Sequence, residues 1–546
     1  MKKLFVLLTV IVTMAMAQAQ EMSRPQLETG RVAEAVGLYK NGDNQKAIEL
    51  LLQEIGVNKK NGYAYFYMTY IFQYSSIEQL GVTEEEFQKI KDPVFLLNGY
   101  DEALKCLPKK DKDYQSLSYY YKAMIFQANE LFVESNEMLD KAFKLIKSGD
   151  YLQEKGHNCI YMDKYEEAKS WFEAANNIFQ SSSNYLGLAI AHINLEEYDK
   201  AIEMARIAIS YDDERKNYAL AQLARAYVET GDYISAVEPA IAGVLFVGYD
   251  WMFEQLFDLM EKQPELIVAK LKIALIEHPE KEGLIKDLLS RVYYFYLDDY
   301  RNTIKYALEL KALAPDYKNS YFLLCYSYLQ LDEYVSALSE IENLIALDSL
   351  NSHVYALKFD AYDGLGDWDK ALAAIEKAIV LDPKNGVLYS HRALVYRRIG
   401  KIDDAIDDYF MAMTLIPDDS YFVLQRGVLL KQQNKHVAAE ADFRKVIEMD
   451  SLSGRYQRMC FAYCFLGEKE KAIAAFVEGY AQKEIGDYDA ACVYSLLGEK
   501  EMALRYLERA LDNGFSNFVH IEKDTDLDNI RELPEFKALI DRYKNQ

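Results

Sequence analysis

The sequence predicts an all-α solenoid, a stack of about fourteen antiparallel helix pairs that occupies nearly the whole chain. Three observations lead to this fold class. Short segments of the form aromatic-x-x-small recur at a fixed interval, apolar residues within each interval follow helical spacing, and the 546 residues are 51% hydrophobic with only 10 prolines. This composition supports a large core and leaves little room for long disordered linkers. Because repeats pack only on their neighbours, the length does not require several globular domains.

The repeat rests on the spacing of small residues. Where one double gap is allowed for, the small residues of six segments lie 33 to 35 residues apart: Tyr165/Ala168, Tyr198/Ala201, Tyr233/Ala236, Tyr300/Thr303, Tyr334/Ala337 and Trp368/Ala371. Ala269 fills the double gap. Extending the series in both directions adds Ala47, Ala103, Ser135, Ala405, Ala439, Ala472 and Ala503. The chain therefore contains about fourteen units.

Each unit is predicted to form two helices joined by a short turn. In one unit, Tyr355 and Tyr362 lie seven residues apart, which places them on the same face of a first helix. Gly366-Asp367 then marks the turn, where the aspartate is suited to cap the second helix. Pro383 ends that second helix, because proline cannot continue its hydrogen-bond ladder.

One unit carries a family pattern especially clearly, in the residues Tyr389, Ala393, Tyr396, Gly400, Ala405, Tyr409, Ala412 and Pro417. A period near 34 with these aromatic, small and terminal-proline positions resembles the tetratricopeptide repeat. The resemblance covers roughly residues 30 to 515. It implies a right-handed superhelical solenoid whose first helices line an inner, concave face. It also implies a protein that holds other proteins or extended peptides on that face.

Two stretches depart from the period. Between Ala47 and Ala103 the interval is 56 residues, about 22 more than one period, and Thr83 with Glu86 forms a capping box that predicts an inserted helix. The segment 239–264 contains many large apolar residues and few of the residues that define the repeat. For this segment two interpretations stay open. It is either a degenerate unit with a heavy core or an exposed docking patch.

Beyond Ala510 the repeat pattern stops, and a last helix with one apolar face is expected to cap the open end of the stack. The predicted domain organisation follows from these landmarks. It comprises a signal peptide (1–19), N-terminal repeats with an inserted helix (20–110), further repeats (111–235), a degenerate region (236–300), regular repeats (301–515) and a capping helix (516–546).

The N-terminus has the three parts of a cleavable export signal. A basic start, MKK, precedes an apolar run over 4–17 and a small-x-small cleavage motif at 17–19. The run of roughly 14 residues is shorter than the ~20 that a bilayer crossing needs. The first cysteine is Cys106, so no thiol near the cleavage site is available for a lipid anchor. We expect an exported, periplasmic protein with no integral membrane span. The alternative is a retained amphipathic or signal-anchor helix.

The charge balance argues against nucleic acid as a partner. Asp and Glu outnumber Lys and Arg by 86 to 62, for a formal net charge of −24, and no run of basic residues occurs. Phosphate binding requires clustered cationic side chains, which this chain lacks. The acidic balance is typical of a solvated outer surface that keeps a long apolar solenoid soluble.

The six cysteines are predicted to be small buried residues rather than disulfides. Cys325 and Cys460 fall in the first-helix slot that other units fill with a small side chain, and Cys159 falls in a buried aromatic slot. Cys460 and Cys464 lie four apart on one helix, which orients them poorly for a bridge. No further Cys or His completes a metal site beside them.

Catalytic motifs are absent from the sequence. The seven histidines form no His-x-x-x-His pair, and there is no phosphate-binding glycine loop and no Gly-x-Ser-x-Gly turn. Acidic pairs such as Asp298-Asp299 fall at turns between helices, where carboxylates near helix N-termini are ordinary structural charges. We therefore predict no enzymatic activity, no catalytic residue, no metal ion and no cofactor.

Candidate partner-binding residues follow from the resemblance, which places certain aromatic and charged side chains on the concave face. The acidic candidates precede the basic ones along the chain, so the concave face is expected to change from acidic to basic along the repeats. We call the two groups of charged residues the acidic step and the basic step. Exposed aromatic rings would grip a peptide or stack on a sugar. The candidates are Tyr120, Tyr121, Phe322, Tyr326, Asp360, Asp363, Arg397, Arg398, Tyr421, Lys431, Arg458 and Phe461.

Two function classes remain. The first is a periplasmic interaction scaffold or adaptor that binds proteins or extended peptides on its concave face, including components of envelope complexes. The second is a carbohydrate or cell-wall binding protein that uses the exposed aromatic residues of a chain with 44 tyrosines. Capture of partners and binding to glycans separate the two.

Overall fold

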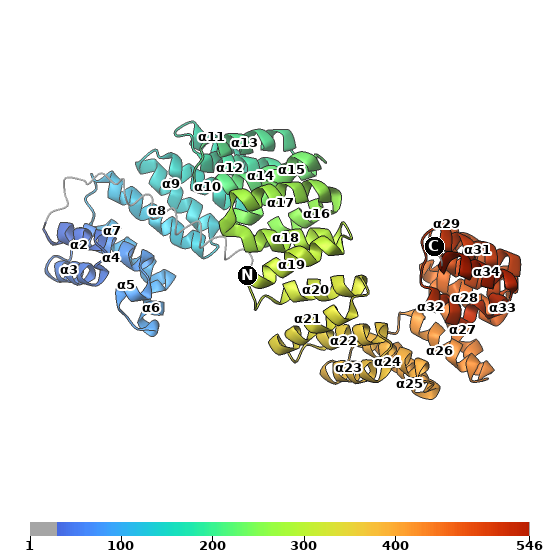
Figure 1. Ribbon diagram of the computed structural model, residues 1–546. Coiled ribbons are helices and arrows are strands. Elements are labelled where there is room, and N and C mark those ends of the chain that lie inside the picture. The colour runs from blue at the N-terminus through green and yellow to red at the C-terminus, as the bar shows by residue number, and fades with distance from the viewer. Residues whose placement is uncertain (1–29, 545–546) are drawn as a thin grey trace. The chain divides into compact units, whose positions relative to one another are not determined.

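The computed structural model describes residues 30–544, and Figure 1 shows that this part of the chain is a succession of helices. No β-strand occurs within 30–544. The predicted signal peptide, residues 1–19, lies outside the described residues. The chain divides into two compact units between Ile285 and Lys286, and each unit is described separately.

The first unit contains seven helix pairs, two of whose helices are separated by an insertion. Its helices are α2 (Arg31–Lys40), α3 (Asn44–Val57), α4 (Gly62–Tyr74), α5 (Ile77–Leu80), α6 (Glu84–Lys91), α7 (Pro93–Cys106), α8 (Lys112–Ala128), α9 (Phe132–Leu145), α10 (Gly149–Tyr161), α11 (Tyr165–Asn176), α12 (Ser182–Asn194), α13 (Tyr198–Ser210), α14 (Lys216–Glu229), α15 (Tyr233–Phe246), α16 (Asp250–Lys262), α17 (Pro264–Glu277) and the 3₁₀ helix η1 (Pro279–Lys281).

The second unit begins within α18 and contains the remaining pairs, followed by short terminal helices. Its helices are α18 (Glu282–Phe295), α19 (Tyr300–Leu313), α20 (Lys318–Gln330), α21 (Tyr334–Leu347), α22 (Ser352–Gly364), α23 (Trp368–Leu381), α24 (Gly386–Arg398), α25 (Ile402–Leu415), α26 (Ser420–Gln432), α27 (His436–Ser453), α28 (Tyr456–Leu466), α29 (Lys469–Ala481), α30 (Asp487–Leu496), α31 (Lys500–Asp512), α32 (Phe518–Lys523), η2 (Thr525–Leu527), α33 (Asp528–Arg531) and α34 (Pro534–Lys544).

The fourteen predicted small residues each fall in the second helix of a pair, from α3 to α31. All of them are buried except Ala269, which is exposed on α17. The prediction for Ala269 is wrong by two positions. Ile267, fully buried, fills the equivalent slot, because α17 begins at Pro264 and its fourth residue is the one that faces the first helix. A large apolar side chain thus replaces the usual small residue in this pair.

Most turns between paired helices share one backbone feature. The residue five positions before the buried small residue has a left-handed backbone, with φ between 49° and 85°. Glycine adopts this conformation without strain, whereas L-residues are strained in it. The N–H of the next residue then donates a hydrogen bond back to the first helix. For example, the Asp367 N–H donates to the carbonyl oxygen of Tyr362 at 3.0 Å. The turn residues are Gly42, Glu130, Asp163, Glu196, Gly231, Asp298, Asp332, Gly366, Gly400, Asn434, Gly467 and Gly498.

Replacing Gly366 by alanine tests this turn. Its φ is 70°, and an added Cβ would meet no atom within 4 Å, so only backbone strain is introduced. We expect Gly366→Ala to lower the free energy of unfolding by about 1 kcal/mol, measured by denaturant titration of the Trp368 fluorescence. Asp332→Gly, at the equivalent turn, serves as the control and is expected to be neutral or stabilising. Equal destabilisation by both changes would contradict this explanation.

The insertion between α4 and α7 consists of two short helices, α5 and α6. Each begins at a complete capping box, Ser76 with Gln79 and Thr83 with Glu86. The Thr83 capping box was predicted from the sequence and is confirmed. The ammonium group of Lys91 at the end of α6 donates to the carbonyl oxygen of Gln73 on α4 at 2.8 Å, and this bond ties the insertion to the repeat stack.

The apolar segment 239–264 belongs mainly to the core. Pro239 lies inside α15, and Val244, Leu245 and Met252 are buried with at most 4% of their surface exposed. Of the two interpretations open from the sequence, the structure supports the degenerate unit with a heavy core. Phe246 is the exception, with 38% of its surface exposed.

The six cysteines are free thiols. Cys159, Cys325 and Cys460 are at most 1% exposed, which confirms their prediction as small buried residues. Burial also raises the pKa of the Cys325 thiol, so this side chain stays neutral.

The chain segment after α31 closes the end of the second unit. Helices α33 and α34 pack on α31, and Ile530, Phe536 and Ile540 are buried against it. The opposite side carries charged residues, among them Asp528 and Lys537, which are exposed. The segment therefore has the two-faced character expected of a cap.

The first unit contains a buried polar cluster between α8, α9 and α10. The side-chain amide of Gln127 donates to Glu154 at 3.2 Å and to Asn158 at 2.8 Å, and Asn158 in turn donates to Ser135 at 2.9 Å. Glu154 is 5% exposed, and burial raises the pKa of its carboxyl to about 7. Nearby His157 is shifted in the opposite sense, because burial lowers its pKa to about 4.

Glu154 makes stability depend on pH. Its folded-state pKa lies above the usual value of 4.5, so the stability contributed by its protonated form is fully present below pH 4.5 and is lost as the pH rises through about 7. We expect the free energy of unfolding of Glu154→Gln to equal that of the parent protein at pH 4.5 and to be higher by about 3 kcal/mol above pH 7. Urea unfolding at both values measures this difference. Because His157 is unchanged in both proteins, a pH-independent difference would contradict the assignment to Glu154.

Candidate binding surface on the first helices of the second unit

Side chains from five successive first helices contact one another along one face of the second unit. The contacts run from α20 to α22, from α22 to α24, from α24 to α26 and from α26 to α28. A continuous surface therefore crosses the repeats rather than following any one of them. We call it the inner stripe and define it by Phe322, Tyr326, His353, Asp360, Asp363, Arg397, Arg398, Lys431, Phe461 and Phe465.

The α20–α22 end of the inner stripe is aromatic. The Tyr326 hydroxyl and His353 Nε2 lie 2.5 Å apart, and the Phe322 ring lies 6.3 Å from Tyr326 and 5.7 Å from His353, between centroids. Burial lowers the pKa of His353, so the imidazole is neutral at pH 7. This end presents ring faces and edges without a positive charge.

Two carboxylates follow on α22, and their environments differ. Asp363 forms an ion pair with Arg398 of α24, with 3.3 Å between Nε and Oδ1. Asp360 is exposed, and no described residue forms a hydrogen bond or an ion pair with it. Desolvation by the surrounding protein and the neighbouring charge of Asp363 raise the pKa of the Asp360 carboxyl to about 6. Asp360 is therefore an available acceptor that is ionised at neutral pH.

Two cations on α24 and α26 also lack an ionic partner among the described residues. Arg397 Nη1 lies 3.5 Å from the side-chain oxygen of Gln425, and Lys431 Nζ donates to the carbonyl oxygen of Phe465 at 3.1 Å. Both side chains are exposed, and no described residue forms an ion pair with either. Burial raises the pKa of the Asp526 carboxyl to about 7, and the charges of Arg397 and Lys431 oppose this rise. Asp526 of the cap thus lies within electrostatic reach of this basic step.

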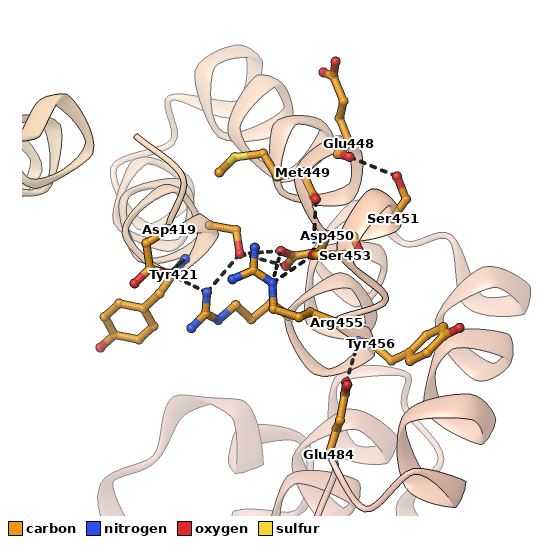
Figure 2. Close-up of polar contacts among 12 residues, drawn as sticks. Asp419, Tyr421, Glu448, Met449, Asp450, Ser451, Ser453, Arg455, Tyr456 and Glu484 are labelled. Atoms are coloured by element: carbon orange, nitrogen blue, oxygen red, sulfur yellow. Dashed lines mark hydrogen bonds and ion pairs between the residues drawn. The ribbon is translucent and has the colours of Figure 1, made fainter. Parts of the chain in front are cut away.

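Arg458, a further basic candidate on α28, is bound through a network of polar contacts at the start of α26, where Asp419 and Tyr421 lie (Figure 2). Its Nη1 donates to Asp419 at 2.5 Å and to the Ser420 hydroxyl at 3.0 Å, and its guanidinium lies 5.7 Å from the Tyr421 ring centroid. Tyr421 is half-buried, and the Arg458 guanidinium lies over its ring. Both predicted residues are therefore in contact with other parts of the protein.

The buried carboxylate of Asp450 at the end of α27 fixes that network. Ser420 Oγ lies 2.7 and 2.8 Å from its two oxygens, and Arg455 Nε lies 3.3 Å from Oδ1 (Figure 2). Burial raises the pKa of Asp450, against the opposing effects of Ser420 and Arg455. Three consecutive helices are joined here, so the network has a structural role.

The α28 end of the inner stripe is aromatic again. Phe461 and Phe465 are half-buried, with ring centroids 6.5 Å apart, and Phe465 stacks on Phe443 at 5.1 Å. The ammonium group of Lys431 lies 5.2 Å from the Phe465 ring centroid. The basic step therefore borders an apolar surface.

The prediction that Tyr120 and Tyr121 are accessible is wrong. They are 7% and 6% exposed, and each packs against other tyrosine rings. The Tyr120 ring lies 5.5 Å from Tyr151, and the Tyr121 ring lies 5.0 Å from Tyr70, between centroids. The register alone does not show this, because the covering rings come from other helices.

His353 and Asp526 were not among the candidate residues predicted from the sequence. His353 occupies the slot of α22 that Tyr421 occupies in α26, 68 residues later, so the repeat spacing could have identified it. Asp526 belongs to the non-repeating cap, and no repeat spacing applies there. Its position became visible only with the folded chain.

Residues 357–420, which include the acidic step and both arginines of α24, match the family model of the tetratricopeptide repeat. This segment consists of tetratricopeptide repeats. Paired helices, buried small residues and left-handed turns recur in the other helix pairs. Tetratricopeptide repeat proteins are scaffolds that bind protein or peptide partners, and the family is generally non-enzymatic.

Comparison with known proteins finds similarity to tetratricopeptide and other proteins. A chloroplastic protein of Arabidopsis thaliana is 25% identical over 114 residues, which span 21% of this chain and 32% of that protein. Yeast Tom70 is 14% identical, with a TM-score of 0.35 over 71% of this chain and 94% of that one. A tetratricopeptide repeat protein from Parabacteroides merdae is 15% identical, with a TM-score of 0.31 over 50% and 93%.

Two further findings concern residues 30–544. None of the described helices combines the length and the apolar composition that crossing a bilayer requires. The described His, Cys, Asp and Glu side chains form no group of three or more with the geometry of a metal site.

Proposed function

We propose that the chain is an exported, periplasmic interaction scaffold that binds extended segments of partner proteins along the inner stripe. The observation that carries this proposal is the contrast between paired and unpaired charges on one face. Asp360, Arg397 and Lys431 have no ionic partner among the described residues, although ion pairs join neighbouring charges such as Arg398 and Asp363. Aromatic side chains flank these charges at both ends, as in surfaces that hold peptides.

The periplasmic location is part of the proposal and is supported by the N-terminal sequence. The basic start, the apolar run and the cleavage motif fit a signal peptide that is removed on export. Osmotic-shock fractionation, followed by mass determination of the mature N-terminus, tests it. Recovery of the uncleaved chain with the membrane fraction would favour the retained signal-anchor helix instead.

Site-specific photo-crosslinking tests where partners bind. A photoreactive amino acid at Gln432, which is exposed beside Lys431 on α26, reports on the inner stripe. The matched control is Val437 on α27, which is 86% exposed on the second helix of the same pair. We expect crosslinks from position 432 and few from 437, and we expect the double variant Arg397→Glu/Lys431→Glu to lower partner affinity by at least about tenfold. Crosslinks from 437 alone would contradict the proposal.

The carbohydrate alternative is less well supported by the geometry. Stacking on a sugar requires a free ring face, whereas Phe322, Tyr326 and Phe461 are half-buried and contact other side chains. A glycan array with the purified protein separates the two functions. Tight glycan binding that Tyr326→Ala abolishes, without any protein crosslink at position 432, would favour the carbohydrate function.

A further inference from the structure

The unpaired charges of the inner stripe are separated by sign. The acceptor, Asp360, lies on α22 beside the aromatic end, and the donors, Arg397 and Lys431, lie on the next two first helices, α24 and α26. A ligand that satisfies one sign of charge alone would leave the other without a partner. The spatial order of the charges therefore contains information about the ligand.

The surface around Asp360 fits a cationic side chain. Asp360 and His353 lie seven residues apart, on one face of α22, and the charge of Asp360 contributes to the raised pKa of Tyr326 on α20. A carboxylate therefore lies on the same helix face as a cluster of aromatic rings that includes a neutral imidazole. A lysine or arginine side chain would gain both an ion pair and contact with a ring face there.

The surface around Arg397 and Lys431 fits a carboxylate. Their hydrogen bonds go to uncharged oxygens, so the positive charge of each remains uncompensated by direct contact. Asp526 lies within electrostatic reach but does not form an ion pair with either. An acidic side chain of a ligand would receive charge-assisted hydrogen bonds from both.

The helix spacing sets the distance between the two subsites. Neighbouring packed helices lie roughly 8–10 Å apart, and Arg397 and Lys431 are one and two first helices beyond Asp360. An extended chain advances about 3.3 Å per residue. A ligand that reaches both subsites therefore separates its cation from its anion by about three to six residues.

We propose that the inner stripe recognises a dipolar peptide segment, in which a basic side chain binds at Asp360 and the α20–α22 aromatic cluster, and an acidic side chain about three to six residues away binds at Arg397 and Lys431. This inference rests on the proposed function and specifies the chemistry of the partner. It excludes uniformly acidic and uniformly basic segments as preferred ligands.

Fluorescence anisotropy with labelled synthetic peptides tests the inference. The dipolar probe has two arginines and two glutamates separated by four alanine or serine residues and is made in both chain directions. The comparison probes are a uniformly acidic and a uniformly basic peptide of equal length. We expect one direction of the dipolar probe to bind about tenfold more tightly than either uniform peptide. Equal affinity for all probes would overturn the inference.

Variants of matched chemistry assign each end. Asp360→Asn is expected to weaken the dipolar probe about fivefold while strengthening the acidic one, and Arg397→Gln is expected to weaken both. The control is Arg444→Gln on α27, outside the inner stripe, because Arg444 is paired with Glu440 and should change affinity less than about twofold. An effect of Arg444→Gln as large as that of Arg397→Gln would overturn the inference.

A competition experiment separates the inference from the proposed function. If partner crosslinking at Gln432 is suppressed by the dipolar probe and not by the uniform ones, both stand. If crosslinking occurs but the uniform probes compete as well as the dipolar one, the inference fails and the proposed function stands. If position 432 gives no crosslink and none of the probes binds, the proposed function fails and the inference fails with it.

Discussion

Phe172→Ala is expected to lower the free energy of unfolding of the first unit by about 3–5 kcal/mol. The Phe172 ring on α11 is fully buried between two first helices, α10 and α12. Gly156 and Gly187 make room for it, since a Cβ on either would lie 2.7 or 2.4 Å from the ring. Removing the ring opens a cavity between two repeats that the rigid helices cannot collapse to fill.

Fluorescence of the adjacent Trp171 during denaturant unfolding reports the change. Phe179→Ala is the matched control, because this phenylalanine is 65% exposed and its loss should change stability by less than about 0.5 kcal/mol. Gly187→Ala alone should destabilise the unit by about 1–3 kcal/mol through overpacking, and should be nearly neutral in the Phe172→Ala background. Additive effects of the two changes would show that the ring and the glycine do not interact.

Arg392→Met is expected to destabilise the second unit by about 3–5 kcal/mol, because it leaves a buried carboxylate without its partner. Asp408 is 4% exposed and receives hydrogen bonds from Arg392 Nε and Nη2 at 2.8 and 2.7 Å. Burial raises the pKa of Asp408, and Arg392 opposes that rise. The next repeat contains the same arrangement in Arg426 and Asp442, at 2.9 and 2.7 Å.

The pH dependence identifies the mechanism. Without Arg392, the folded-state pKa of Asp408 rises further above its unfolded value, so the lost stability should return as the pH falls and the carboxyl becomes protonated. The double variant Arg392→Met/Asp408→Leu should recover most of the stability at pH 7. Arg444→Met, which breaks an exposed pair with Glu440, is the control and should cost less than about 0.5 kcal/mol. A loss equal at pH 4 and pH 7 would contradict the role of Asp408.

The repeat architecture could be predicted from sequence because it depends on local spacing. Helix pairs, turns and buried small residues recur with one period, and a capping box such as Thr83 with Glu86 lies within four residues. The prediction failed at Ala269 because it required a small residue. The start of α17 at Pro264 would have pointed to Ile267 instead.

The state of the candidate binding residues could not be predicted in this way. Whether a charge is available depends on partners a full repeat away, such as Asp363 for Arg398 or Asp419 for Arg458. Burial has the same origin, since Tyr121 is covered by Tyr70 from another pair. Sequence spacing placed these side chains on the first helices, but the contacts between helices decided which of them remain accessible.

The left-handed turns described above have a consequence for how such a chain can evolve. Glycine, asparagine, aspartate and glutamate all occupy the same turn position, and the positions at Gly366 and Gly400 are 34 residues apart. An exchange of DNA between two such positions would add or remove one whole helix pair and leave an intact turn at the junction. The length of the chain, and with it the span of surface that it offers, can thus change in single modules without a new folding solution.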